Sequence, residues 1–173
     1  MNKNFTNKYL KMKTILGIDP GLTKTGWGLI SVKQNNISYI ASGTIYTDAK
    51  QEISQRLNFL HHNISQILSN YKPDEAAIEE TFVNKNPVSS LKLGQARGAI
   101  ILSISLANIK IYEYASTSVK KAVVGVGRAE KNQVGMMIKI LLPKSNCKSE
   151  DEADALAVAI CHNNNNSLLY KIR

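Results

Sequence analysis

The stretch "TILGIDPG", residues 14–21, decides the fold of this chain. Its apolar residues are typical of a strand buried inside a sheet, and the following Pro20 and Gly21 end that strand at once. Asp19 therefore stands where the strand ends, close to a place where a charge is costly unless something compensates it. The stretch predicts a core strand with a polar site at its carboxyl end.

Outward from this strand, the sequence alternates between strand and helix patterns. An opening hairpin followed by crossover helices predicts an α/β fold, a mixed sheet with antiparallel and parallel neighbours that is flanked by helices. The predicted strands cover 13–19, 25–33, 36–46, 75–80 and 109–115, and the predicted helices run from 53 to before Pro73 and over 88–107, 116–124, 130–141 and 150–163.

The chain has the length and composition of one globular domain. Of its 173 residues, 43% are hydrophobic, which is enough for a substantial core. We expect a flexible N-terminal extension at 1–12, one domain at 13–163 and a polar C-terminal tail at 164–173. No apolar run reaches the roughly 20 residues of a membrane span, and the N-terminus lacks the apolar core of a signal peptide. We therefore expect a cytoplasmic protein, in which Cys147 and Cys161 are free thiols.

The charge balance favours an anionic partner. The formal net charge is +9, and eight Lys or Arg residues lie between Lys110 and Lys148 against two Glu. Such an excess indicates binding to nucleic acid or to an anionic membrane surface. Neutralisation of phosphates by these side chains would make the binding sensitive to salt.

Further acids occur at the ends of other predicted elements. The strand "EAAIEE" carries Glu79 and Glu80 at its carboxyl end, and strand alternation alone leaves open which of the two faces the site. In "SEDEADALAVAI", Asp151 and Asp154 are three residues apart, so they lie near each other on one helical face. Two carboxylates that converge there would repel unless a cation held them.

These acids predict a metal site built from oxygen ligands. Hard ions such as Mg²⁺ take carboxylate and water ligands, and two ions about 4 Å apart can stabilise the attacking and leaving oxygens in phosphodiester cleavage. Each acid alone is more often a solvated loop or helix end, but their conjunction at element ends of a basic protein favours a nuclease. The candidate ligands are Asp19, Glu79 or Glu80, Asp151 and Asp154.

Four ordered motifs, "LGIDPG", "AAIEETF", "LKLGQARG" and "DEADALAVAI", resemble those of Holliday-junction resolvases of the RuvC type. The resemblance implies a ribonuclease-H-like fold and a Mg²⁺-dependent homodimer that resolves four-way DNA junctions by paired symmetric incisions during recombination and repair. It also implies two ions per site, Mn²⁺ as a substitute, and a branch-migration helicase complex as a partner. The family's metal ligands match Asp19, Glu79, Asp151 and Asp154, which selects Glu79 over Glu80.

The same resemblance implies three DNA-binding residues and shows one departure. Lys120 and Lys131 resemble lysines that contact DNA in the family, and Phe82 resembles an aromatic residue that stacks at the opened junction. Glu152 stands where family members commonly have a small residue. With Ser149 three residues before it, Glu152 has the form of a capping box, so we expect it to cap the helix rather than to add a charge at the site.

Small residues mark the helix predicted at 88–107. Gly94, Ala96, Gly98 and Ala99 would let another backbone approach closely, and we expect close packing there. Two symmetric incisions require two sites in a fixed relation, so this helix is also a candidate for the dimer interface.

Other functions stay open at the level of sequence. An ATPase of the actin or sugar-kinase type can also open with an aspartate and a glycine after a strand, but it needs a second lobe for which this chain is too short. A related nuclease that cuts structured RNA would share the fold and the ion site. A nucleic-acid-binding module without catalysis would lack one of the four carboxylates, and all four are present.

Overall fold

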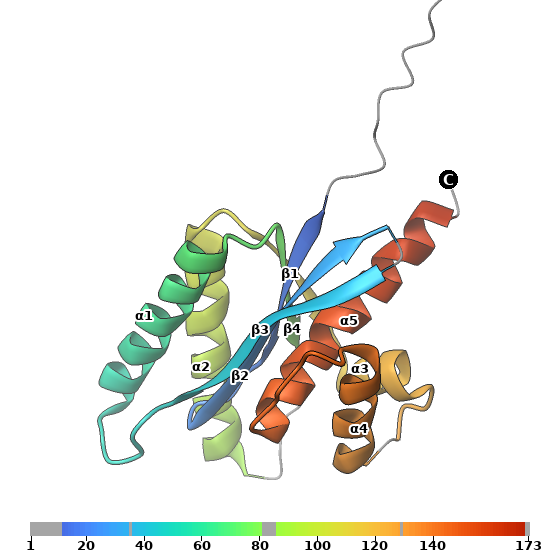
Figure 1. Ribbon diagram of the computed structural model, residues 1–173. Helices are drawn as coiled ribbons and strands as arrows, with labels where there is room; N and C mark the ends of the chain where they lie inside the picture. Colours follow the sequence, from blue (N-terminus) through green and yellow to red (C-terminus); the bar gives the residue numbers. More distant parts are fainter. Residues whose placement is uncertain (1–11, 35, 81–85, 129, 172–173) are drawn as a thin grey trace, which may run out of the picture.

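The computed structural model describes residues 12–34, 36–80, 86–128 and 130–171, with the backbone alone described at 131 and 166–171. The strands are β1 (Lys13–Asp19), β2 (Lys24–Lys33), β3 (Asn36–Tyr46), β4 (Glu75–Glu79) and β5 (Lys110–Tyr114). The described residues form one five-stranded sheet in the order β3-β2-β1-β4-β5 (Figure 1). The pairs β1–β2 and β2–β3 are antiparallel, whereas β1–β4 and β4–β5 are parallel, so the predicted mixed sheet is confirmed.

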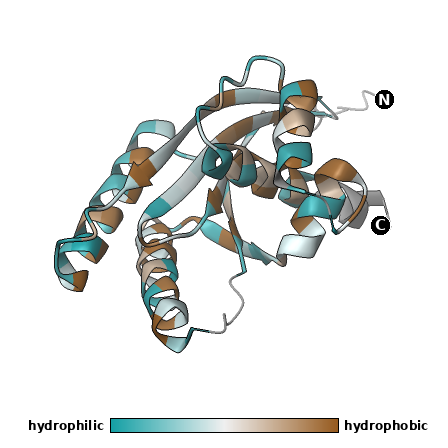
Figure 2. Ribbon diagram, turned by 90° about the horizontal axis from the view of Figure 1, so that it is seen from below, coloured by the Kyte–Doolittle hydropathy of each residue, from teal (hydrophilic) through white to brown (hydrophobic). Residues whose placement is uncertain are grey.

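Helices cover both faces of this sheet. α1 (Ile53–Tyr71) and α2 (Pro87–Leu106) pack on one face, and α3 (Ser116–Val124), α4 (Lys131–Leu141) and α5 (Glu150–Lys171) pack on the other (Figure 1). The central strand β1 is buried on both sides, because Ile15 belongs to the core under α5 and Leu16 to the core under α1. Hydrophobic and hydrophilic residues alternate along the outer helices (Figure 2), as expected for helices with one face on the core.

α5 lies close against β1 and β2 because glycines face its backbone. A Cβ atom at Gly17 would stand 2.1 Å from the carbonyl oxygen of Ala155, and one at Gly26 would stand 2.0 Å from that of Asp151. Any larger residue would therefore push the helix away from the strands. As a result, the first turn of α5 lies beside the end of β1.

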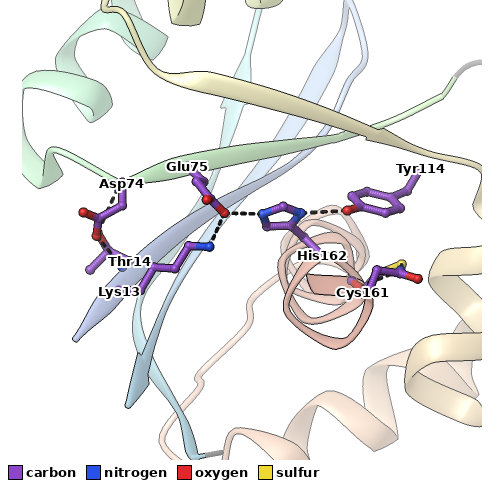
Figure 3. Close-up of polar contacts among 8 residues, drawn as sticks. Lys13, Thr14, Asp74, Glu75, Tyr114, Cys161 and His162 are labelled. Carbon is purple, nitrogen blue, oxygen red and sulfur yellow. Dashed lines mark hydrogen bonds and ion pairs between the residues drawn. The ribbon is translucent and has the colours of Figure 1, made fainter. Parts of the chain in front are cut away.

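A buried polar chain fixes the middle of α5 to β4 and β5 (Figure 3). His162 is fully buried, with Nε2 at 2.6 Å from Glu75 Oε2 and Nδ1 at 2.7 Å from the Tyr114 hydroxyl. Burial raises the pKa of Tyr114 to about 12, so the phenol keeps its proton and donates to Nδ1. Nε2–H then donates to the Glu75 carboxylate, which also pairs with Lys13.

The order of elements is as predicted, and one helix end differs. α5 continues to Lys171 through the asparagine run, so its predicted end at 163 is wrong. Asparagine costs a helix less than about 1 kcal/mol per residue, and the Asn165 side chain donates to the Cys161 carbonyl at 2.9 Å. The division of the chain into extension, domain and tail stays a prediction. None of the helices in the described ranges is long and apolar enough to span a bilayer.

The small residues of α2 serve different purposes on its two sides. Ala96 is fully buried, as expected for close packing. Among the described residues, no atom lies within 4 Å of a Cβ placed at Gly94 or Gly98. The predicted close packing inside this chain is therefore wrong for these two glycines, because they lie on the outer side of the helix.

Candidate active site

The parallel pairing of β1 and β4 brings two acids to one edge of the sheet. Ile18 pairs with Ile78, so the residues that follow, Asp19 and Glu79, end their strands side by side. Glu79 has the same parity as Ala77, which packs in the core beneath α5, so its side chain leaves the sheet on that face. Glu79 is half-buried, whereas the following Glu80 is exposed.

Asp19 and Glu79 line a small cavity together with residues from three helices. The cavity has a volume of about 200 Å³, and α5 adds a third carboxylate, Asp154. α3 contributes an ammonium group, Lys120, so three acids and one base share the same space. The remaining lining residues are Ser116, Val119 and Val134.

Asp151 lies one turn before Asp154 and does not line this cavity. Its backbone packs on Gly26, which is the residue of β2 that pairs with Asp19. Asp151 is half-buried. The structure therefore gathers Asp19, Glu79 and Asp154 in one cavity and brings Asp151 to the neighbouring strand position.

The donor chemistry of this cavity fits a hard divalent cation. Carboxylate oxygens are the ligands that Mg²⁺ prefers. Among the side chains that the structure describes, no three His, Cys, Asp or Glu residues are already close enough together to hold an ion. The fit therefore rests on the chemistry of the acids and on their common cavity.

The three predicted DNA-binding residues have different outcomes. Lys120 lines the cavity, half-buried among the carboxylates. Lys131 begins α4, and its side chain is outside the described residues. Phe82 also lies outside the described residues, in the connection between β4 and α2.

Sequence reasoning missed Ser116, which lines the cavity at the start of α3. The signal was present, because Ser116 follows directly after β5, a strand parallel to β4. The carboxyl ends of parallel strands meet at one edge of a sheet, where ligands bind in open α/β folds. A polar residue just beyond such a strand is therefore a candidate for the site.

Comparison with known proteins gives a consistent result. The family model described as "Crossover junction endodeoxyribonuclease RuvC" matches residues 15–162. The protein of that name from Rhizobium leguminosarum bv. trifolii is 52% identical over 151 residues, covering 87% of this chain and 89% of that protein. Its namesake from Sinorhizobium medicae is 50% identical over 154 residues, covering 89% and 92%.

Solved structures agree with the sequence matches. The RuvC structure from Thermus thermophilus has a TM-score of 0.81 at 28% identity, covering 90% of this chain and 96% of that one. RuvC of the same organism in complex with a Holliday junction substrate also has a TM-score of 0.81, at 29% identity, covering 87% and 93%. The yeast mitochondrial Holliday junction resolvase Ydc2, at 12% identity and a TM-score of 0.62, covering 90% of this chain and 81% of that one, shares the fold. These likenesses confirm the predicted ribonuclease-H-like fold.

Proposed function

The chain belongs to the RuvC family of crossover junction endodeoxyribonucleases, and on that premise we propose that the cavity between β1, β4 and α5 is its catalytic site. The activity is the endonucleolytic resolution of Holliday junctions in DNA recombination and repair. The observation that carries the assignment is that Asp19, Glu79 and Asp154 line one cavity. We assign Asp151, one turn earlier on α5, as the fourth acid.

The four carboxylates are proposed to hold metal ions. The RuvC family is metal-dependent, and the oxygen ligands favour two Mg²⁺ ions per site, which Mn²⁺ can replace. When bound, such cations supply Lewis-acid stabilisation of the oxygens that attack and leave the phosphorus. Asp19 and Glu79 would hold them from the sheet, and Asp154 would hold them from the helix.

Other residues of the cavity act on the scissile phosphate. The Lys120 ammonium, which lines the same cavity, binds a non-bridging phosphate oxygen and offsets its negative charge. The apolar side chains of Val119 and Val134 limit the access of water, which strengthens the electrostatic interactions inside the cavity.

Asp154→Asn tests the assignment with little change in side-chain size. We expect the variant to bind a synthetic four-way junction but to cut it more than about a hundredfold more slowly, because even residues behind metal ligands contribute about 10- to 100-fold. Mg²⁺ should raise the melting temperature of the wild-type protein, since it binds the folded state, and should fail to do so for the variant. Glu150→Gln, which changes an exposed acid on the same helical turn, is the control. Cleavage retained by Asp154→Asn would contradict the site.

Basic residues are proposed to guide the DNA to this cavity. A neighbouring hollow of about 270 Å³ shares Asp154 with the cavity and is lined by Lys139 and Lys148 as well as by a second acid, Glu150. We propose that Lys120 binds a phosphate inside the cavity, that Lys131 binds a further phosphate of the junction, and that Phe82 stacks on a base at the opened junction. Lys131→Ala should weaken junction binding and lower the slope of log affinity against log salt by about 1. An unchanged affinity and slope would remove Lys131 from the interface.

We further propose a homodimer that forms through α2. A stripe on the outer side of this helix is apolar and exposed: Val88, Leu91, Leu102 and Leu106 are 60%, 67%, 58% and 66% exposed. Gly98 lies on the same stripe, and no described atom comes within 4 Å of a Cβ placed there, so a second helix can approach closely. A second copy of this chain is the proposed occupant, because two symmetric incisions need two sites in a fixed relation.

Two further assignments depend on the family resemblance. We propose a branch-migration helicase complex as a partner and the cytoplasm as the location. Co-sedimentation of the junction-bound protein with a purified branch-migration complex tests the first, and fractionation of cells tests the second. Sedimentation of the protein alone in the presence of the complex would count against the partnership.

Family membership favours DNA over the alternative substrates. The relatives are named endodeoxyribonucleases, and one related structure is a complex with a Holliday junction substrate. A nuclease for structured RNA or an inactive binding module is therefore the weaker assignment. Competition by a folded RNA four-way junction, at equal concentration, would reveal an RNA preference.

A further inference from the structure

Glu152 is a buried acid in the first turn of α5, directly after Asp151 and two residues before Asp154. Its exposed fraction is 6%, and its carboxylate accepts a hydrogen bond from the Ser42 hydroxyl of β3 at 2.7 Å. Glu152 is not among the residues that line the proposed catalytic cavity. Its side chain therefore reaches the edge strand of the sheet and leaves the cavity to the other acids.

A second hydrogen bond ties the same turn of α5 to β3. The hydroxyl groups of Thr44 and Ser149 are 2.7 Å apart, and the Glu152 backbone N–H donates to Ser149 Oγ at 3.2 Å. Ser42 and Thr44 are two residues apart, so they leave β3 on the same face. Tyr39 extends the contact, since its hydroxyl lies 3.1 Å from Ser42 Oγ.

The Glu152 carboxylate has a structural role other than helix capping. The Ser149 hydroxyl accepts from the Glu152 backbone N–H, which is one half of the predicted capping box. The Glu152 carboxylate bonds instead to Ser42, 110 residues away in the sequence, so the capping role predicted for this acid is wrong. A buried carboxylate is costly, and an apolar side chain would fill the same space without that cost. What the carboxylate adds is a directional contact that fixes how the first turn lies on β3.

We propose that Glu152 is a positioning residue that, through Ser42, holds the first turn of α5 so that Asp151 and Asp154 face Asp19 and Glu79 at the distances that a metal ion requires. This role rests on the proposed catalytic site. Residues that orient metal ligands typically change metal affinity or activity by about 10- to 100-fold when they are removed. The Glu152–Ser42 contact is expected to act in this range.

The test measures metal binding and helix motion as well as cleavage. Mn²⁺ affinity is measured by calorimetry, and amide hydrogen exchange is followed in the segment 150–155. Glu152→Ala should weaken Mn²⁺ binding about tenfold and speed exchange in this segment. Glu152→Gln keeps a side-chain oxygen that can accept from Ser42, so it should stay close to the wild type. Ser42→Ala removes the hydrogen-bond donor and should resemble Glu152→Ala. It tests the same contact if Glu152→Ala does not fold.

Control variants distinguish a positioning role of Glu152 from the mere loss of a negative charge and from a loss of folding stability. Glu150→Ala removes an equal charge from an exposed residue of the same turn, one that lines the hollow beside Asp154. If it weakens Mn²⁺ binding as much as Glu152→Ala does, the positioning role is refuted. A Glu152→Ala protein that only melts earlier, with unchanged Mn²⁺ affinity and unchanged exchange, would also refute it. Mn²⁺ binding that persists in Asp154→Asn would instead overturn the proposed metal site, and with it this role.

Discussion

Replacement of Gly26 by alanine should disable cleavage while the protein stays folded. Gly26 pairs with Asp19 across the β1–β2 ladder and lies beneath the first turn of α5. A Cβ there would stand 2.0 Å from the Asp151 carbonyl oxygen and 2.5 Å from its carbonyl carbon, whereas an ordinary contact begins at 3.4 Å. The helix and the strand would have to separate by the difference of 1.4 Å, because a backbone carbonyl cannot rotate aside as a side chain does.

The size of the effect follows from that displacement. Overpacking of this kind costs about 1 to 3 kcal/mol, which most domains tolerate without unfolding. A misplacement of about 1 Å in a catalytic group can cost about a hundredfold in rate. Asp151 and Asp154 both belong to the displaced turn, so we expect the cleavage rate of Gly26→Ala to fall by about a hundredfold.

The assay is single-turnover cleavage of a synthetic four-way junction in Mg²⁺, with junction affinity measured separately without metal. Circular dichroism and thermal melting establish that the variant is folded. Gly135→Ala is the control for helix propensity, since no described atom lies within 4 Å of a Cβ placed there, and its junction affinity is measured as well because Gly135 lines the hollow beside the cavity. That control should gain about 0.5 to 1 kcal/mol from its better helix propensity. A Gly26→Ala protein that cuts at the wild-type rate would show that the first turn of α5 does not set the site.

Two further predictions concern assembly and pH. Leu102→Lys should convert a dimer to a monomer in sedimentation and should leave junctions nicked once rather than resolved. Ile140→Lys, at a similarly exposed apolar position on α4, should do neither. A dimeric Leu102→Lys protein would exclude the outer side of α2 as the interface. Burial lowers the pKa of His162 despite the neighbouring Glu75, so the unfolded chain takes up a proton first as the pH falls below the usual histidine value of about 6.5. Urea denaturation should therefore show stability falling towards acid by up to about 1.4 kcal/mol per pH unit, and His162→Gln should lose this slope. Burial raises the pKa of Glu75, but the hydrogen bonds and charges of Lys13 and His162 outweigh it, so this pKa is lowered on folding. Glu75 therefore stabilises the folded state above the usual carboxylate pKa, and this stabilisation is lost as the pH falls below that value.

The acids at the sheet edge could be predicted from sequence because the causes are local. The apolar run before Asp19 and the break at Pro20 define the end of β1, and "EAAIE" defines β4 in the same way. Parallel neighbours place those ends together, so the meeting of Asp19 and Glu79 needs no information beyond strand boundaries and order. The choice between Glu79 and Glu80 needed the resemblance, and the exposure of Glu80 agrees with that choice.

The two aspartates of α5 show that helical spacing alone does not predict which side chains line the cavity. A step of three residues turns a helix by about 300°, so side chains at this spacing diverge by about 60° around the axis. That divergence is small enough to describe both as one face. It is also large enough for Asp154 to line the cavity while Asp151 lies outside its lining.

The contacts that hold α5 could not be predicted, because their partners are distant in the sequence. The spacing of Ser149 and Glu152 fits a local cap, and nothing near them indicates that Ser42 is the partner of the carboxylate. The same holds for His162, whose partners Glu75 and Tyr114 are 87 and 48 residues away. Such contacts depend on how strands and helices stack, which only the folded chain defines.

The spacing of these two anchors explains why the site should be sensitive to residues that never touch DNA. Glu152 and His162 are ten residues apart on α5, a separation of about 15 Å along the helix axis. If the contact at Glu152 is lost, His162 and the Thr44–Ser149 hydrogen bond remain, but a tilt of only about 4° about His162 moves the first turn by about 1 Å. Packed helices accommodate small tilts readily, whereas metal ligation does not tolerate such a shift. We therefore expect the anchor at Glu152 to matter even in a helix that is otherwise well packed, since Asp151 and Asp154 lie far from the anchor at His162.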